Sequence, residues 1–223
     1  MRNNEEVQKD VQSAIKWEPL LHAAEIGVTV KDGIVTLTGT VDSYAKKQEA
    51  ENAAKGVPGV NAIVEKIEVT FGSHWKKDDN DIAQEIVSAF KWDWQVPSDK
   101  VKATVENCWV TLDGEVSWNY QREAAKKTAG NQEGVKGVIN HIKLKSESKD
   151  ILEKEAVEQA LARNWSIDMS GINVEVSANV VTLSGTVNSI YQKEQAERLA
   201  WNAPGVWAVN NQLVVEFEYS YMD

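Results

Sequence analysis

The residue types that most often carry chemistry are few in this sequence and lie far apart. The three histidines, His22, His74 and His141, stand singly, without an H-E-x-x-H pair or another metal-ligand spacing. There is no G-x-S-x-G nucleophile motif and no glycine-rich loop that could cradle a phosphate. Glu216 and Glu218 share one face of an expected strand but have no partner base. The sequence therefore predicts no catalytic residue, no metal site and no cofactor, and we expect that the protein is not an enzyme.

A few other polar residues could still bind a ligand. Cys108 is the single cysteine, so it can form neither an internal disulfide nor a thiolate zinc site. Asn140 and Asn211, with Glu65 at the equivalent place, have the parity of inward-facing strand residues. A buried amide needs hydrogen-bond partners. We favour a structural role for each asparagine, tying the third strand of a repeat to the loop before its second helix. A cation or ligand contact is the alternative.

Nine tryptophans are many for 223 residues, and several gather where the first helix of each repeat should end: Trp17, Trp92, Trp94 and Trp165. Aromatic side chains in such a place could enter a membrane interface. Insertion into an anionic surface benefits from basic neighbours, whereas Glu18, Asp93 and Asp168 lie close by in the sequence. We therefore expect these tryptophans to pack in a core or between modules.

The net charge of −10 is spread unevenly along the chain. It is −3 for residues 1–75, zero for 76–146 and −7 for 147–223. Nucleic-acid binding is disfavoured, because neutralising phosphates needs clustered Lys and Arg. The middle segment is best suited to approach anionic lipid, and its candidate lipid or partner contacts are Arg122, Lys126, Lys127, Trp92 and Trp94. A solvated helix face explains the same basic residues.

One seven-residue phrase occurs three times: VTLTGTV at 35–41, VTLDGEV at 110–116 and VTLSGTV at 181–187. When the copies are aligned on this phrase, six glycines coincide in two sets, Gly39, Gly114 and Gly185, then Gly59, Gly134 and Gly205. The spacings of 75 and 71 residues predict three tandem modules, at 1–72, 78–146 and 149–219. We interpret the six glycines as scaffold residues.

Each copy starts with a helix and a hairpin. Apolar residues spaced by three or four form one helical stripe, namely Val7, Val11 and Ile15, then Ile82, Ile86 and Phe90, then Leu152, Val157 and Leu161. Alternating apolar residues predict a strand with one buried face, and Asp32-Gly33 predicts a tight turn. The repeated phrase is the second strand. Its glycine indicates a bulge or the close approach of another backbone.

A second helix and a third strand complete each copy. The helix carries alanine pairs four residues apart, which lets it lie close to a sheet: Ala50 and Ala54, Ala125 and Ala129, Ala196 and Ala200. The predicted fold class is therefore α+β. Three tandem α-β-β-α-β modules each form a three-stranded mixed sheet covered on one face by two helices.

This pattern resembles the BON domain, a family of bacterial domains. The first copy carries it as VTVKDGIVTLTGTV and VPGVNAIVEKIEV, and the third as VEVSANVVTLSGTVNS and APGVWAVNNQLVV. The second copy departs from it at Cys108, Trp109 and Glu133. The resemblance covers nearly the whole chain. It implies a non-enzymatic role associated with osmotic stress, anionic phospholipid, transport or the assistance of other proteins in the periplasm, and potassium binding in a cytosolic relative.

We therefore expect a triple-BON stress protein that binds a phospholipid surface or other proteins. The alternatives are a cytosolic potassium-binding sensor and a structural or transport-associated protein that self-assembles through exposed sheet edges. The sequence contains no run near the roughly 20 apolar residues of a membrane-spanning helix. It begins without the apolar region of a secretory signal. We expect a cytoplasmic location for the sequence as written, or a periplasmic one if it is a trimmed form.

Overall fold

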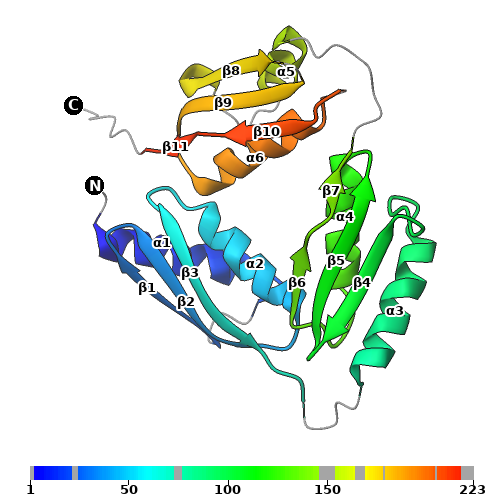
Figure 1. The fold of residues 1–223 in the computed structure, drawn as a ribbon. Helices are drawn as coiled ribbons and strands as arrows, with labels where there is room; N and C mark the ends of the chain where they lie inside the picture. The colour runs from blue at the N-terminus through cyan, green and yellow to red at the C-terminus, as the bar shows by residue number, and fades with distance from the viewer. Residues whose placement is uncertain are drawn as a thin grey trace. The chain divides into compact units, whose positions relative to one another are not determined.

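The structure is a computed structural model that describes residues 3–21, 25–72, 77–145, 154–163, 169–177, 179–203 and 205–216. Figure 1 shows its helices and strands in chain order. The first module contains α1 (Asn4–Trp17), β1 (Ile26–Lys31), β2 (Ile34–Val41), α2 (Tyr44–Lys55) and β3 (Ala62–Val69). Its sheet has the order β1-β2-β3, with β1 antiparallel to β2.

The second module repeats this order. It contains α3 (Asp79–Trp92), β4 (Val101–Glu106), β5 (Trp109–Val116), α4 (Asn119–Gly130), β6 (Gly137–Asn140) and β7 (Lys143–Leu144). β4 is antiparallel to β5, whereas β6 and β7 are both parallel to it. Helices α3 and α4 pack against each other, α3 also against β4 and α4 against β5. The module therefore has a mixed sheet with two helices.

The third module has the same plan. It contains α5 (Lys154–Ala162), a single 3₁₀ turn (Met169–Gly171), β8 (Ile172–Ser177), β9 (Val180–Val187), α6 (Ile190–Trp201), β10 (Ala208–Asn211) and β11 (Val214–Val215). β8 is antiparallel to β9, and β10 and β11 are parallel to it. The predicted α+β class with three tandem modules is confirmed.

The third strand differs from the prediction in two of the three modules. A continuous strand is present only as β3 of the first module, while the second and third modules divide it into two pieces. Both pieces keep one register, because Leu112 lies opposite Asn140 and Glu115 opposite Lys143, the same offset in each pair. The interruption is therefore a local loss of pairing without a shift of the strand.

Helices meet sheets through the residues that the sequence pattern selected. All three members of the first stripe are buried in α1 and in α3, and Val157 and Leu161 are buried in α5. Leu152 lies outside the described residues. The six paired alanines of α2, α4 and α6 have no exposed surface. A methyl group is the smallest side chain that still fills this contact, so these helices can approach the sheet closely.

The repeated phrase needs its glycine for a steric reason. Gly39, Gly114 and Gly185 have φ of 131°, 143° and 112°. A Cβ at these positions would lie 1.9, 2.1 and 2.0 Å from the carbonyl oxygens of Glu25, Lys100 and Gly171. Both the dihedral angle and the contact exclude a side chain. The predicted close approach of another backbone is confirmed in all three copies.

The hairpin turns use the conformation that the sequence indicates. Asp32 and Gly33 have φ of 52° and 76°, and Asn107 and Cys108 have φ of 53° and 66°. A positive φ is unfavourable for Cys108, which has a Cβ. The carboxylate of Asp79 compensates, because it accepts hydrogen bonds from the backbone amides of Asn107 and Cys108, each at 2.8 Å. The first residue of α3 thereby fixes the hairpin.

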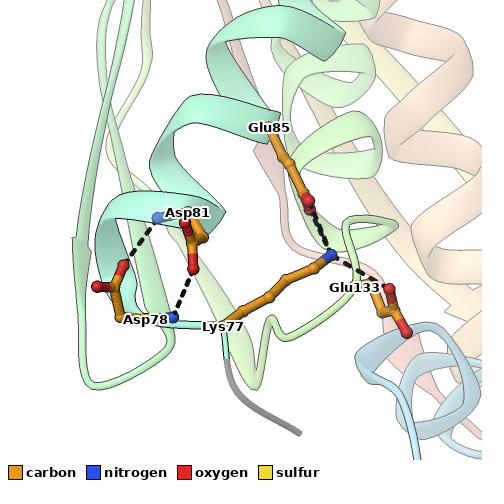
Figure 2. A network of polar contacts seen from close by, with 5 residues as sticks. All are labelled: Lys77, Asp78, Asp81, Glu85 and Glu133. Atoms are coloured by element: carbon orange, nitrogen blue, oxygen red, sulfur yellow. Dashed lines mark hydrogen bonds and ion pairs between the residues drawn. The ribbon is translucent and has the colours of Figure 1, made fainter.

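The start of α3 is held by a polar network, drawn in Figure 2. Asp78 accepts from the amides of Asn80 and Asp81, and Asp81 accepts from the amide of Asp78, which is a capping box. Lys77 lies 2.8 Å from Glu85 of α3 and 3.1 Å from Glu133, which follows α4. Glu133 stands where the other copies have proline, so in this module an ion pair joins the residue before the N-cap of α3 to the loop after α4.

Candidate contact surfaces

The two asparagines of the third strands make structural hydrogen bonds. Asn140 Nδ2 donates to the carbonyl of Arg122 at 3.3 Å, and its Oδ1 accepts from the amide of Ile142 at 3.0 Å. Asn211 Nδ2 donates to the carbonyl of Lys193 and to Glu197, each at 3.0 Å, and its Oδ1 accepts from the amide of Leu213. The prediction that each asparagine bonds to the loop before the second helix is wrong. Each side-chain amide bonds instead to a backbone carbonyl of the second helix itself.

These bonds lie where the third strands are interrupted. The amide of Ile142 or Leu213 bonds to the asparagine two residues earlier, while the amides of His141 and Gln212 still donate to the carbonyls of Leu112 and Leu183, each at 2.8 Å. In the first module the equivalent residue is Glu65, and β3 runs through unbroken. There Lys47 of α2 donates to the carbonyl of Ile67 at 2.8 Å. In this module the donor side chain therefore belongs to the helix and the acceptor carbonyl to the strand.

The tryptophans contradict the expectation of core packing. Trp17, Trp92 and Trp94 are 85%, 90% and 85% exposed. Trp165 lies outside the described residues. Of the seven tryptophans that the structure describes, none is buried. The helical periodicity of the sequence indicates this exposure, because Trp17 and Trp92 each follow the last apolar stripe residue by two positions, about 200° around the helix. They point away from the buried face for that reason.

The segment that carries Trp92 and Trp94 is itself well fixed. Asp93, between them, accepts from the hydroxyl of Thr128 in α4 at 2.6 Å and from the amide of Gln95 at 3.0 Å. Val96 just beyond is buried in the core of the module. The backbone is therefore anchored at both sides of the turn while the two indoles face solvent. Such an arrangement presents apolar surface at a low cost in chain entropy.

The structure does not gather the candidate basic residues around this turn. Lys127 is exposed and precedes Thr128, which contacts Asp93. Arg122 lies one and a half helical turns earlier, where its carbonyl is bonded to Asn140 of β6. The guanidinium of Arg122 is 3.4 Å from Glu123. Lys126 is four residues from Arg122 and shares its side of α4. Of these three basic residues, Lys127 is the one that adjoins the tryptophan turn, because its neighbour Thr128 bonds to Asp93.

The remaining titratable residues form no reactive group in the described part of the chain. His141 is exposed and lies 3.7 Å from Asp113. Glu216 is exposed, while His22, His74 and Glu218 fall outside the described residues. Across the described ranges, no three His, Cys, Asp or Glu side chains are placed to hold a metal ion. Each helix described here is also too short or too polar to cross a membrane.

Sequence reasoning missed one hollow in the second module. Lys100, Glu115, Val116, Ser117 and Lys145 line a surface pocket of about 320 Å³ at one end of the sheet. No motif marks these residues, which come from three separate strands or strand ends. A comparison of the three copies at equivalent positions would have found them, since the other copies have no lysine there.

The repeat, the shared register and the α-β-β-α-β order define a protein made of three copies of one small α+β fold. The chain belongs to the BON family: the model of the BON domain matches residues 3–70, 78–146 and 153–216. It is similar to osmotically-inducible protein Y of Escherichia coli (strain K12), with 32% identity over 139 residues, which are 60% of this chain and 69% of that protein.

Solved structures offer little further guidance. The C-terminal domain of CdsD, a structural protein of the type III secretion system of Chlamydia trachomatis, is 15% identical and matches 97% of this chain and 100% of that one. The TM-score of 0.26 is too low to support any argument. A second CdsD structure gives a TM-score of 0.24.

Proposed function

We propose that this chain is a non-enzymatic binding protein of the osmotic-stress type, and that its second module contacts phospholipid surfaces through Trp92 and Trp94. The name of the similar E. coli protein supports the stress context. The single observation that carries the contact is the exposure of 90% and 85% for these two indoles on one anchored turn. Exposed aromatic pairs of this kind mark interaction surfaces far more often than isolated apolar residues do.

Two physical points favour a lipid surface as the partner. Tryptophan prefers the membrane–water interface, where its ring is buried and its N–H stays hydrated. Both indoles are almost fully exposed, so each ring is accessible to a lipid surface. Lys91 and Lys127, both exposed, lie next to Trp92 and Thr128 in the sequence and can approach lipid phosphates. Asp93 opposes this attraction, but its carboxylate is occupied by Thr128 and Gln95.

Vesicle co-sedimentation tests this function. We expect the full chain to pellet with phosphatidylcholine vesicles containing phosphatidylglycerol, and W92A/W94A to lose about tenfold or more in partitioning, because two large aromatic surfaces are removed. The matched control is W207A, which removes a 52% exposed tryptophan from the third module. Equal pelleting of W92A/W94A and the unchanged chain, or no pelleting with any vesicle, would contradict the proposal. Retention on a protein partner that is lost in W92A/W94A, without vesicle binding, would make the same turn a protein contact.

A further inference from the structure

The outer face of the second module's sheet is unusually basic. Strand alternation turns Lys100, Lys102, Lys143 and Lys145 away from the core, since Val101 beside them is buried. All four lysines are exposed. They flank a central acidic pair on β5, because Lys102 lies opposite Asp113 and Glu115 lies opposite Lys143. At this end of the sheet the edge strands carry the positive charge and the central strand carries the negative charge, while Glu106 lies on the same face at the other end of β4.

Most of this positive charge has no partner within the protein. Lys145 is 3.6 Å from Glu115, and Asp113 is 3.7 Å from His141. Among the residues that the structure describes, Lys100, Lys102 and Lys143 form no ion pair. Three unpaired lysines on one sheet face repel one another. A bound anion would relieve this repulsion.

The other modules provide an internal reference for this face. At the places of Lys100, Glu115, Ser117 and Lys145, the first copy has Glu25, Thr40, Asp42 and Thr70, and the third has Gly171, Thr186, Asn188 and Glu216. Neither set contains a cation, although all three sheets share their register at this end. The amides of Thr70, Lys145 and Glu216 donate to Val41, Val116 and Val187 at 2.8–2.9 Å. The scaffold therefore does not require lysine here.

Two of the four lysines line the pocket at the end of this sheet. Its polar lining residues are Lys100, Lys145, Ser117 and Glu115. The bond from the amide of Lys145 to the carbonyl of Val116, at 2.9 Å, holds the two strand ends together beneath it. A volume of about 320 Å³ is at the lower end of the range for small-molecule sites.

We propose that this pocket binds the phosphate group of a small phosphate ester that also carries a hydroxyl. Lys100 and Lys145 supply charge to the phosphate oxygens, and Ser117 donates a hydrogen bond to them. Glu115 is an acceptor beside the phosphate position, so it selects a ligand whose neighbouring hydroxyl can donate to it. Glycerol phosphate has this chemistry, either free or as the headgroup of phosphatidylglycerol. The site is separate from Trp92 and Trp94, so it goes beyond the proposed function.

Amide NMR of the full chain tests the site, with inorganic phosphate and sn-glycerol 3-phosphate as probes. We expect saturable shifts at the amides of Lys100, Ser117 and Lys145, with glycerol phosphate binding more tightly than phosphate. K100Q/K145Q should weaken binding about tenfold or more, since charge-assisted contacts are lost. The matched control is K31Q/K66Q, which removes the same charge from exposed positions of the first module's sheet and should change nothing.

Vesicles distinguish the two sources of the ligand. If phosphatidylglycerol vesicles displace glycerol phosphate, and K100Q/K145Q abolishes this displacement, the headgroup is the source. If free glycerol phosphate binds and vesicles do not compete, the source is a soluble ester. The proposal is overturned if no saturable shift occurs at these amides, or if K100Q/K145Q and K31Q/K66Q bind glycerol phosphate equally. W92A/W94A should bind it normally, which separates this test from that of the proposed function.

Discussion

At the scale of single residues, glycines decide whether two backbone segments of each module can lie close together. Gly39 shows this most clearly, because the carbonyl oxygen of Glu25 occupies the place where a Cβ would be. The same exclusion recurs at Gly114 and Gly185, on the neighbouring backbone of the second and third copies. The glycine of the phrase that recurs in the sequence is thus a steric requirement of the fold.

The first prediction concerns Gly39→Ala. The added methyl would meet the Glu25 oxygen at 1.9 Å with φ at 131°, so we expect destabilisation of about 3 kcal/mol from overpacking and backbone strain. Urea denaturation followed by circular dichroism measures it. Gly72→Ala is the control, because no atom lies within 4 Å of its Cβ position. A similar small effect for both substitutions would contradict the steric explanation.

The second prediction is a pH dependence at Lys77. The hydrogen bond to Glu85, more than that to Glu133, raises the pKa of Lys77 above its usual value. A group whose pKa is higher in the folded state stabilises the fold below its unfolded pKa, near 10.4, and loses this contribution as the pH rises through the folded pKa. Lys77→Met should therefore cost about 0.5–1 kcal/mol at pH 7, a range typical of exposed pairs.

This cost should decrease as the pH rises above about 10.4 and should vanish only above the raised folded pKa of Lys77, where the residue is neutral in both states. Denaturation of both proteins at pH 7 and at a series of pH values above about 10 measures the difference. Lys31→Met, which removes an exposed lysine from the first module, should show no comparable change. A constant difference across this pH range would show that the aliphatic chain of Lys77, and not its charge, stabilises α3.

At the scale of elements, the third strand and the second helix are joined by one side chain. Asn211 makes three hydrogen bonds, to Lys193, Glu197 and Leu213, whereas Asn140 makes two. The helix and strand pattern predicted both elements in each module. It could not predict the bond from the asparagine to the second helix, because the partner carbonyl is 18 residues away in sequence.

The third prediction follows from this bond count. Asn211→Ala should destabilise the third module by about 2–3 kcal/mol and Asn140→Ala the second by about 1–2 kcal/mol, because partly buried partners lose their hydrogen bonds. Amide hydrogen exchange at Leu213 and Ile142 should accelerate in the respective variant. Asn210→Ala is the control, since Asn210 is exposed on the same strand. An equally large effect of Asn210→Ala would mean that the strand tolerates no substitution there.

At the scale of the whole molecule, three similar cores are distributed along one chain. Val35, Val110 and Val181 are equivalent residues of the repeated phrase, and each has no exposed surface. Val110 and Val181 belong to separate clusters of buried residues. The predicted boundaries at 1–72, 78–146 and 149–219 therefore lead to a proposal that each module unfolds as its own cooperative unit.

The fourth prediction tests these units with Val181→Asp. Burying a carboxylate costs several kcal/mol and should unfold the third module. Hydrogen exchange of the full chain should then show loss of protection in β8 and β9, with β4 and β5 still protected. Val110→Asp should give the reverse pattern. Loss of protection in all three modules from either substitution would show that the chain unfolds as one unit.

The sequence by itself determined the three copies, their element order, the buried stripes and the glycines, because each of these depends on periodicity or on local backbone geometry. Only the tertiary structure decided that Trp92 and Trp94 face solvent on an anchored turn, that asparagines bond two third strands to the second helices, and that Lys100 and Lys145 line one pocket with Ser117. Those features depend on contacts between residues far apart in the chain, and sheet register places such residues side by side without leaving a local pattern.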